Sequence, residues 1–332
     1  MTDSLTHDLA QDSPAPDWIQ ALEEQDRSVI LGKEEVIRLV LVALIAGGHV
    51  LAEDVPGVGK TTLLKAVARC LSLDFARLQC TPDLLPSDVT GVTFFDPAER
   101  SFHFRPGPVF SHILLADEIN RTTPRTQSAL LEAMAEMQVT VDGETRPLPA
   151  PFWMVATQNP VESQGTYPLP EAQLDRFLMR IEIGYPDADS EVSLLLGRTL
   201  ADPLASLTPV AQADAVLATR ESALRTHLSE PVARYIVDLV TLTRTSDNVL
   251  LGASPRAALD LSRAARARAF LSGRDHVLPD DVKALALPVL SHRLMLDASA
   301  RLTGRSAGHV LKELLERVPA PREAPFPAPG AR

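Results

Sequence analysis

The chain has 332 residues, 45% of them hydrophobic and 23% charged, a composition typical of a globular protein long enough for two domains. Its net charge of −11 argues against general attraction to nucleic acid, and its two cysteines, Cys70 and Cys80, offer neither a disulfide framework nor metal-ligand spacing. Because the first residues lack a signal-peptide pattern and no apolar run is long enough to cross a bilayer, we expect a cytoplasmic protein without membrane insertion.

In chain order, the sequence predicts a tail, an α/β domain, a helical domain and a second tail. Residues 1–16 are polar and predict a disordered tail. Within residues 17–186, helical spacing alternates with short apolar runs, which indicates a parallel sheet between helices on both faces. The helices are expected at 18–30, 33–46, 61–69 and 124–135, and the strands at 50–52, 75–79, 113–116, 151–157 and 177–183.

The composition changes after residue 186. From 187 to 318, Ala, Leu and Arg recur at helical spacing, and prolines interrupt the segments. Pro255 and Pro279 stand where the first turn of a helix is expected. We therefore predict a second, smaller all-α domain without strands, followed by a proline-rich disordered tail over residues 319–332.

The segment from Asp54 to Thr61, Asp-Val-Pro-Gly-Val-Gly-Lys-Thr, lies between the first expected strand and a helix. In such a turn, successive main-chain N–H groups point inward at the positive end of the helix, which is where phosphates bind. Lys60 would reach and neutralise the outer phosphates, and the Thr61 hydroxyl would coordinate magnesium. The predicted nucleotide-binding residues here are Asp54, Val55, Pro56, Gly57, Val58, Gly59, Lys60, Thr61 and Thr62.

Asp54 departs from the phosphate-loop pattern G-x-x-x-x-G-K-[ST], because it occupies the position of the first glycine. Aspartate tolerates left-handed backbone angles better than most residues, but its charge would lie near an anion site. The alternative is a chance glycine turn in an inactive fold. The flanking strand and helix, which the motif requires, favour the phosphate site.

A second motif lies 57 positions after Lys60. The apolar run Ile113–Ala116 predicts a strand buried on both faces, and it ends in Asp117-Glu118. Ligands of parallel sheets bind at the carboxyl ends of the strands. We expect Asp117 to hold magnesium and Glu118 to polarise the attacking water, the alternative being a solvated acidic turn.

From about residue 30 to residue 310, the chain resembles the MoxR family of AAA+ ATPases, in the helix-2-insert branch. Besides the phosphate loop, the resemblance rests on TPDLLPSDVTG (81–91), ADEINR (116–121), QSALLEAM (127–134), ATQNP (156–160), GTYPLPEAQLDRF (165–177) and SPR (254–256). It implies a P-loop NTPase fold of the AAA+ type, with a helical lid and a hexameric ring. Relatives commonly carry Asp at position 54, which lessens the weight of that departure.

The resemblance also implies roles that spacing alone does not. Asn159 matches the sensor 1 residue, which would help Glu118 to position water, and Arg256 matches sensor 2, which would contact the terminal phosphate from the lid. Arg176 matches the arginine finger that completes the site of the adjacent subunit. Gln79 matches a polar switch that holds Glu118 inactive.

Two of these residues could instead have purely structural roles. Asn159 could simply form a turn before Pro160, and Arg176 could form a salt bridge to Asp175 or Glu171.

Two β-hairpins are predicted, at residues 91–104 and 137–147, and they match the helix-2 insert and the hairpin before sensor 1. In a ring they would face the pore or a client. Aromatic residues of the first hairpin could grip a client, but a small core is the favoured interpretation. These residues are Phe94, Phe95, Phe102 and Phe104.

The predicted function is Mg²⁺-dependent ATP hydrolysis by a ring that remodels or matures partner proteins, with von Willebrand A domain clients implied by the resemblance. A nucleic-acid motor, a chelatase-type subunit and a nucleotide-gated scaffold with little turnover remain alternatives. The scattered histidines predict no metal other than magnesium. The arginines of one lid helix are expected to pair with nearby acids rather than to bind nucleic acid; they are Arg263, Arg266, Arg268 and Arg274.

Overall fold

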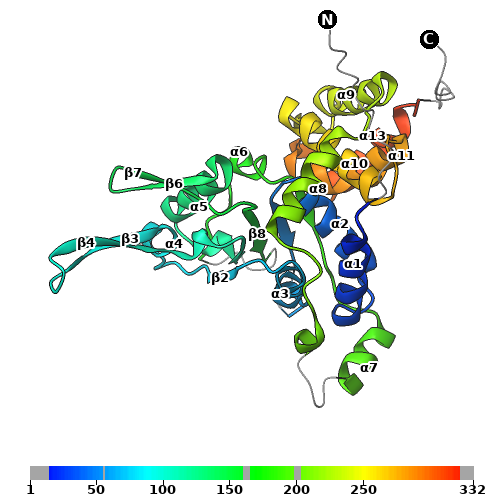
Figure 1. The fold of residues 1–332 in the computed structure, drawn as a ribbon. Coiled ribbons are helices and arrows are strands. Elements are labelled where there is room, and N and C mark those ends of the chain that lie inside the picture. The colour runs from blue at the N-terminus through cyan, green and yellow to red at the C-terminus, as the bar shows by residue number, and fades with distance from the viewer. Residues whose placement is uncertain (1–14, 55–56, 160–164, 198–202, 322–332) are drawn as a thin grey trace, which may run out of the picture.

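The computed structural model describes residues 15–54, 57–159, 165–197 and 203–321 (Figure 1). Val55, Pro56 and nearly all of the two predicted tails, 1–16 and 319–332, lie outside these residues. In the described part of the chain, no helix combines the length and the apolar character that crossing a membrane requires.

A five-stranded parallel sheet forms the centre of the larger domain, as predicted. Its strand order is β2-β5-β8-β1-β9, so β2 lies at one edge and β5 lies between two neighbours. The strands are β1 (Val50–Glu53), β2 (Phe75–Gln79), β5 (Ile113–Asp117), β8 (Trp153–Gln158) and β9 (Met179–Ile181).

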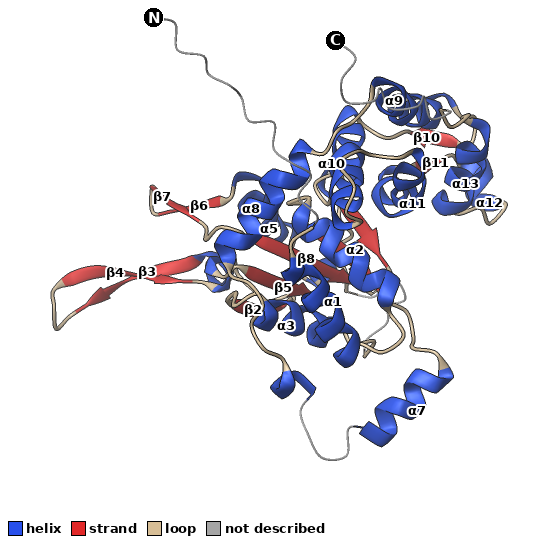
Figure 2. Cartoon of the chain, turned by 45° about the vertical axis from the view of Figure 1, so that its right-hand side comes forward, coloured by secondary structure: helices blue, strands red, loops and turns tan. Residues whose placement is uncertain are grey.

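Alternate residues of the strands enter two separate cores, because successive side chains of a strand point to opposite faces. Ile113 and Leu115 pack in the core that includes α2, α3 and the lid helices, whereas Leu114 and Ala116 pack in the core that includes α5. The expected layer of helices on each face is therefore present (Figure 2). The helices of this domain are α1 (Asp17–Val29), α2 (Glu34–Ile45), α3 (Lys60–Cys70), α4 (Pro86–Thr90), α5 (Pro124–Glu136) and α6 (Glu171–Leu174), with short 3₁₀ turns at Pro108–Phe110 and Ile119–Arg121.

The lid domain is helical, and Pro255 and Pro279 begin two of its helices as predicted. The helices after β9 are α7 (Ala188–Gly197), α8 (Ala213–Arg225), α9 (Glu230–Thr245), α10 (Pro255–Leu271), α11 (Pro279–Leu290), α12 (Ala298–Leu302) and α13 (Ala307–Arg317), with 3₁₀ turns at Pro203–Ser206 and Ser291–Arg293. Of these, α7 lies apart from α9, α10, α11 and α13 (Figure 1). The expectation that this region lacks strands is wrong in one detail. β10 (Val249–Leu251) and β11 (Met295–Leu296) form a small antiparallel pair, too short to leave a periodic pattern in the sequence.

Three of the four arginines of α10 and its C-terminal turn pair with acids, as expected. Arg263 contacts Asp260 at 2.5 Å, and Arg268 and Arg274 contact Asp281 at 3.5 and 2.7 Å. Arg266 instead donates to the main-chain carbonyls of Leu224 and Thr226.

Both predicted hairpins are present and project from the body on the same side (Figures 1 and 2). They are β3–β4 (Gly91–Asp96 with Ser101–Pro106) and β6–β7 (Gln138–Val141 with Glu144–Pro147). The guanidinium of Arg146 lies 4.1 Å from the ring centre of Phe104, which brings the bases of the hairpins together.

The expectation that the hairpin aromatics form a core is wrong for three of the four. Phe94, Phe95 and Phe102 are 46%, 50% and 75% exposed, and only Phe104 is half-buried. The rings of Phe95 and Phe102 contact each other across the strands at 5.2 Å. A two-stranded ribbon that extends away from the body has no layer above it to bury these rings.

Candidate nucleotide-binding site

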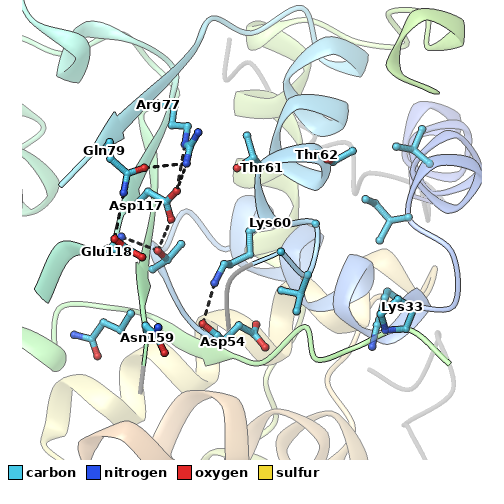
Figure 3. A pocket seen from close by; sticks show the side chains of 18 of the residues that line it. Lys33, Asp54, Lys60, Thr61, Thr62, Arg77, Gln79, Asp117, Glu118 and Asn159 are labelled. Atoms are coloured by element: carbon cyan, nitrogen blue, oxygen red, sulfur yellow. Dashed lines mark hydrogen bonds and ion pairs between the residues drawn. The ribbon is translucent and has the colours of Figure 1, made fainter. Parts of the chain in front are cut away.

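A cavity of about 530 Å³ lies where the β1–α3 turn meets the carboxyl ends of β5 and β8 (Figure 3). This is the edge of a parallel sheet at which ligands bind, and the volume is typical of small-molecule sites. It is lined by Val29, Ile30, Leu31, Lys33, Asp54, Gly57, Val58, Gly59, Lys60, Thr61, Thr62, Arg77, Gln79, Asp117, Glu118, Thr157, Gln158, Asn159 and Pro186.

The described part of the phosphate loop has the predicted backbone geometry. Gly57 and Gly59 have φ angles of 88° and 94°, which an L side chain rarely adopts. Gly59 is the N-cap of α3, so the first N–H groups of that helix are directed toward the cavity. Thr61 and Thr62 lie in the first turn of this helix and line the cavity.

Lys60 extends across the cavity, and its Nζ donates to the main-chain oxygen of Asp54 at 3.1 Å (Figure 3). Burial lowers the pKa of Lys60 from its ordinary value, although the charges of Asp54, Asp117 and Glu118 oppose this shift. A partly desolvated cation here is suited to neutralising an anion.

The carboxylate of Asp54 is directed away from the phosphate cradle. Its two oxygens accept hydrogen bonds from the main-chain N–H groups of Ile183, at 2.6 Å, and Gly184, at 2.9 Å. Asp54 is only 7% exposed. It therefore connects the phosphate loop to the chain segment that follows β9, and the left-handed angles it was expected to tolerate occur at the two glycines instead.

Thr157 holds the acidic pair at the end of β5. Its hydroxyl donates to Oδ1 of Asp117 at 2.7 Å and accepts from the main-chain N–H of Glu118 at 2.8 Å. Glu118 adopts a left-handed conformation, with φ 60° and ψ 51°. Its Oε2 accepts from Arg121 at 3.2 Å and from Gln79 at 3.3 Å, so the predicted contact with Gln79 exists.

Sequence reasoning missed Arg77. Its guanidinium lies 2.6 Å (Nη2) and 3.2 Å (Nε) from Oδ2 of Asp117. The same Nη2 donates to Oε1 of Gln79 at 2.9 Å. The available signal was the two-residue spacing on β2, which places Arg77 and Gln79 on one face of that strand.

The remaining predicted site residues separate into two groups. Asn159 lines the cavity directly after β8. Arg176 does not line it: its Nη1 donates to the carbonyl of Leu131 at 2.8 Å beside a second hollow of about 260 Å³. Arg256 lies in the first turn of α10, half-exposed, with its Nε 4.0 Å from Asp260.

The alternative contacts proposed for Arg176 are not present among the described residues, where it pairs with neither Asp175 nor Glu171. Asp175 instead accepts from Ser254 at 3.0 Å and lies 3.5 Å from Arg293.

The donors around the cavity fit a nucleotide and a magnesium ion. The glycine turn, the start of α3 and Lys60 supply N–H groups and positive charge for phosphates. The Thr61 hydroxyl and the Asp117 carboxylate are oxygen donors of the kind magnesium prefers. Both sets line the same cavity, so one ligand with phosphates and a metal could contact them together.

Comparison with known proteins agrees with this geometry and defines the class. The model of the ATPase family associated with various cellular activities (AAA) matches residues 49–179, and the model of the AAA lid domain matches residues 241–314. The crystal structure of a candidate ATPase from Cytophaga hutchinsonii has a TM-score of 0.86 and 39% identity to this chain, over 92% of this chain and 96% of that one.

The chain belongs to the MoxR family of AAA+ ATPases, as its motifs predicted. It is 39% identical to Chaperone MoxR1 of Mycobacterium tuberculosis, over 92% of this chain and 82% of that protein. It is 34% identical to Protein MoxR of Paracoccus denitrificans, over 86% and 91%. It is 47% identical to the uncharacterized protein YeaC of Bacillus subtilis, over 91% and 94%.

Proposed function

We propose that this protein is a Mg²⁺-dependent ATPase that works as a cytoplasmic, hexameric ring and remodels or matures partner proteins. One observation supports it above all: the glycine turn, Lys60 and the Asp117-Glu118 pair line a single cavity. The name of Chaperone MoxR1 supports chaperone-like work. A client with a von Willebrand A domain is the partner that we propose.

Each residue has a chemical task in this proposal. The main-chain N–H groups that follow Gly57 and the ammonium group of Lys60 bind the phosphates. Thr61 and Asp117 hold the magnesium ion. Magnesium, when bound, neutralises charge on the outer phosphates. Glu118 orients the attacking water, for which its carboxylate must first lose its contact with Gln79.

Asn159 assists Glu118 from the end of β8, because an amide can both donate to and accept from a water molecule. Arg256 contacts the terminal phosphate when the lid closes. In the described structure it lies outside the cavity lining, so this role requires lid movement.

Arg176 is proposed to act in the site of the adjacent subunit. Its position supports this, since its side chain contacts Leu131 and lines a different hollow from the nucleotide cavity of its own chain. A guanidinium supplied in trans would stabilise transition-state charge, and its loss costs about 10³–10⁵-fold in turnover.

The position of Asp54 bears on the scaffold alternative, whose sequence support was a negative charge near the phosphates. That charge is bonded to Ile183 and Gly184 instead. We therefore favour turnover over a non-hydrolysing scaffold.

Phosphate release with and without Mg²⁺ tests hydrolysis directly. Glu118→Gln should keep nucleotide affinity and lose turnover by about 10²–10⁴-fold. Glu221→Gln, at an exposed glutamate of α8, is the matched control and should match the wild type. Equal turnover by Glu118→Gln and wild type would refute the role of Glu118.

A mixing experiment separates a finger in trans from one in cis. Arg176→Ala and Glu118→Gln should each be inactive alone. Mixed rings should recover activity, because a subunit with intact Glu118 can then receive Arg176 from its neighbour. If mixtures stay as inactive as the separate variants, Arg176 does not act in trans.

A further inference from the structure

Arg77 connects the two acidic residues on which the proposed chemistry depends. It donates twice to Oδ2 of Asp117, at 2.6 and 3.2 Å, and once to Oε1 of Gln79, at 2.9 Å. Gln79 in turn donates to Oε2 of Glu118 at 3.3 Å (Figure 3). One guanidinium therefore contacts the metal-binding carboxylate and, through one amide, the carboxylate that would orient water.

The contact with Asp117 occupies one of the two carboxylate oxygens that could hold a metal ion, and Arg77 donates to this oxygen twice. The other oxygen, Oδ1, already accepts from Thr157. A guanidinium keeps its charge at any physiological pH, so it does not release the carboxylate by losing a proton. An ion that binds Oδ2 must therefore displace Arg77 from that atom.

The contact with Gln79 fixes the orientation of an amide. An amide has one acceptor end and one donor end. Because Arg77 donates to the oxygen, the NH₂ group is directed toward Glu118. If Arg77 moves away, this constraint on the amide is lost and Glu118 can exchange its partner.

We propose that Arg77 is a positioning residue that couples metal binding at Asp117 to release of Glu118. Before nucleotide binds, Arg77 neutralises Asp117 and orients Gln79 against Glu118. When metal and ATP are bound, Arg77 would leave Asp117 and Gln79, and Glu118 could then exchange the Gln79 amide for water while it keeps its contact with Arg121. The inference rests on the proposed function, because it assigns the metal to Asp117.

Metal affinity provides a test that does not depend on turnover. Mn²⁺ binding to the full chain, in the presence of a non-hydrolysable ATP analogue, can be titrated by electron paramagnetic resonance. Arg77→Ala should bind Mn²⁺ about five- to tenfold more tightly, which is less than a buried charge-assisted hydrogen bond would give because the side chain is half-exposed.

Arg77→Lys separates displacement from a general effect of charge. Lysine keeps the charge but cannot donate from one planar group to both Asp117 and Gln79. We expect Arg77→Lys to bind Mn²⁺ more tightly than the wild type. Wild-type affinity in Arg77→Lys, with tight binding in Arg77→Ala, would attribute the effect to charge alone and overturn the coupling.

Gln79→Ala tests the second half of the coupling. Gln79 accepts a hydrogen bond from Arg77 that metal binding would break, so this variant should bind Mn²⁺ about two- to fivefold more tightly than the wild type. Its basal turnover should rise, since Glu118 loses a donor. Unchanged Mn²⁺ affinity in Arg77→Ala would overturn the inference but leave the proposed function intact. A wild-type chain that binds no nucleotide would refute both.

Discussion

Removal of the Asp54 carboxylate should destabilise the protein, because two main-chain N–H groups lose their acceptor. Ile183 is buried, and an unsatisfied buried donor costs about 1–3 kcal/mol. Gly184 is partly exposed, so water compensates part of its loss. We expect Asp54→Ala to lower the free energy of unfolding by about 2–4 kcal/mol, and the melting temperature by about 4–8 °C.

Asp54→Asn should cost about half as much, because one amide oxygen can replace only one of the two acceptors. Thermal unfolding and urea titration would measure both variants. Asp238→Ala, at an exposed aspartate of α9, is the matched control and should change stability by less than about 0.5 kcal/mol. If Asp54→Ala keeps full stability and binds nucleotide more tightly, the charge faces the phosphates and the reasoning is wrong.

Three further predictions concern buried and exposed side chains. Burial raises the pKa of Asp26 from 3.8 to about 8, so the folded state favours the neutral carboxyl group and the protein loses stability as pH rises from 4 to 8. Asp26→Leu removes this group, so in urea unfolding its free energy of unfolding should increase relative to that of the wild type over the same range, by at most about 1.4 kcal/mol per pH unit. Burial lowers the pKa of His49 and His292 from 6.5 to about 3, so each contributes stability above pH 6.5 that is lost as pH falls toward 3. In His49→Gln, the free energy of unfolding should therefore fall less steeply over this pH range than in the wild type. The same steepness in both proteins would contradict the prediction. Phe102→Ala should change the free energy of unfolding by less than about 1 kcal/mol, because Phe102 is 75% exposed. A loss of about 3–5 kcal/mol would instead indicate a core residue.

The sequence predicted the elements whose pattern is local. The run Ile113–Ala116 is apolar throughout because both faces of β5 are covered, and Thr123 with Pro124 begins α5 because they satisfy its first turn. The phosphate loop was recognisable because its glycines and lysine must lie between a strand and a helix.

Long-range contacts were not predictable from such patterns. Asp54 and Ile183 are 129 positions apart, and nothing near either residue indicates their hydrogen bond. Arg77 looked like any strand arginine, since its partner Asp117 lies on a neighbouring strand. Phe102 and Phe104 alternate as core residues do, but alternation cannot show whether another layer covers them.

The position of β2 at the edge of the sheet affects how easily Arg77 and Gln79 can move relative to Asp117. Within the described residues, β2 is bonded to the sheet along one side, through β5, whereas β5 is bonded along both sides. Displacing β2, which carries Arg77 and Gln79, would break a single ladder, but displacing β5, which ends at Asp117, would break two. Movement of the edge strand β2, with Arg77 and Gln79, would therefore break fewer main-chain hydrogen bonds than movement of the inner strand β5, with Asp117.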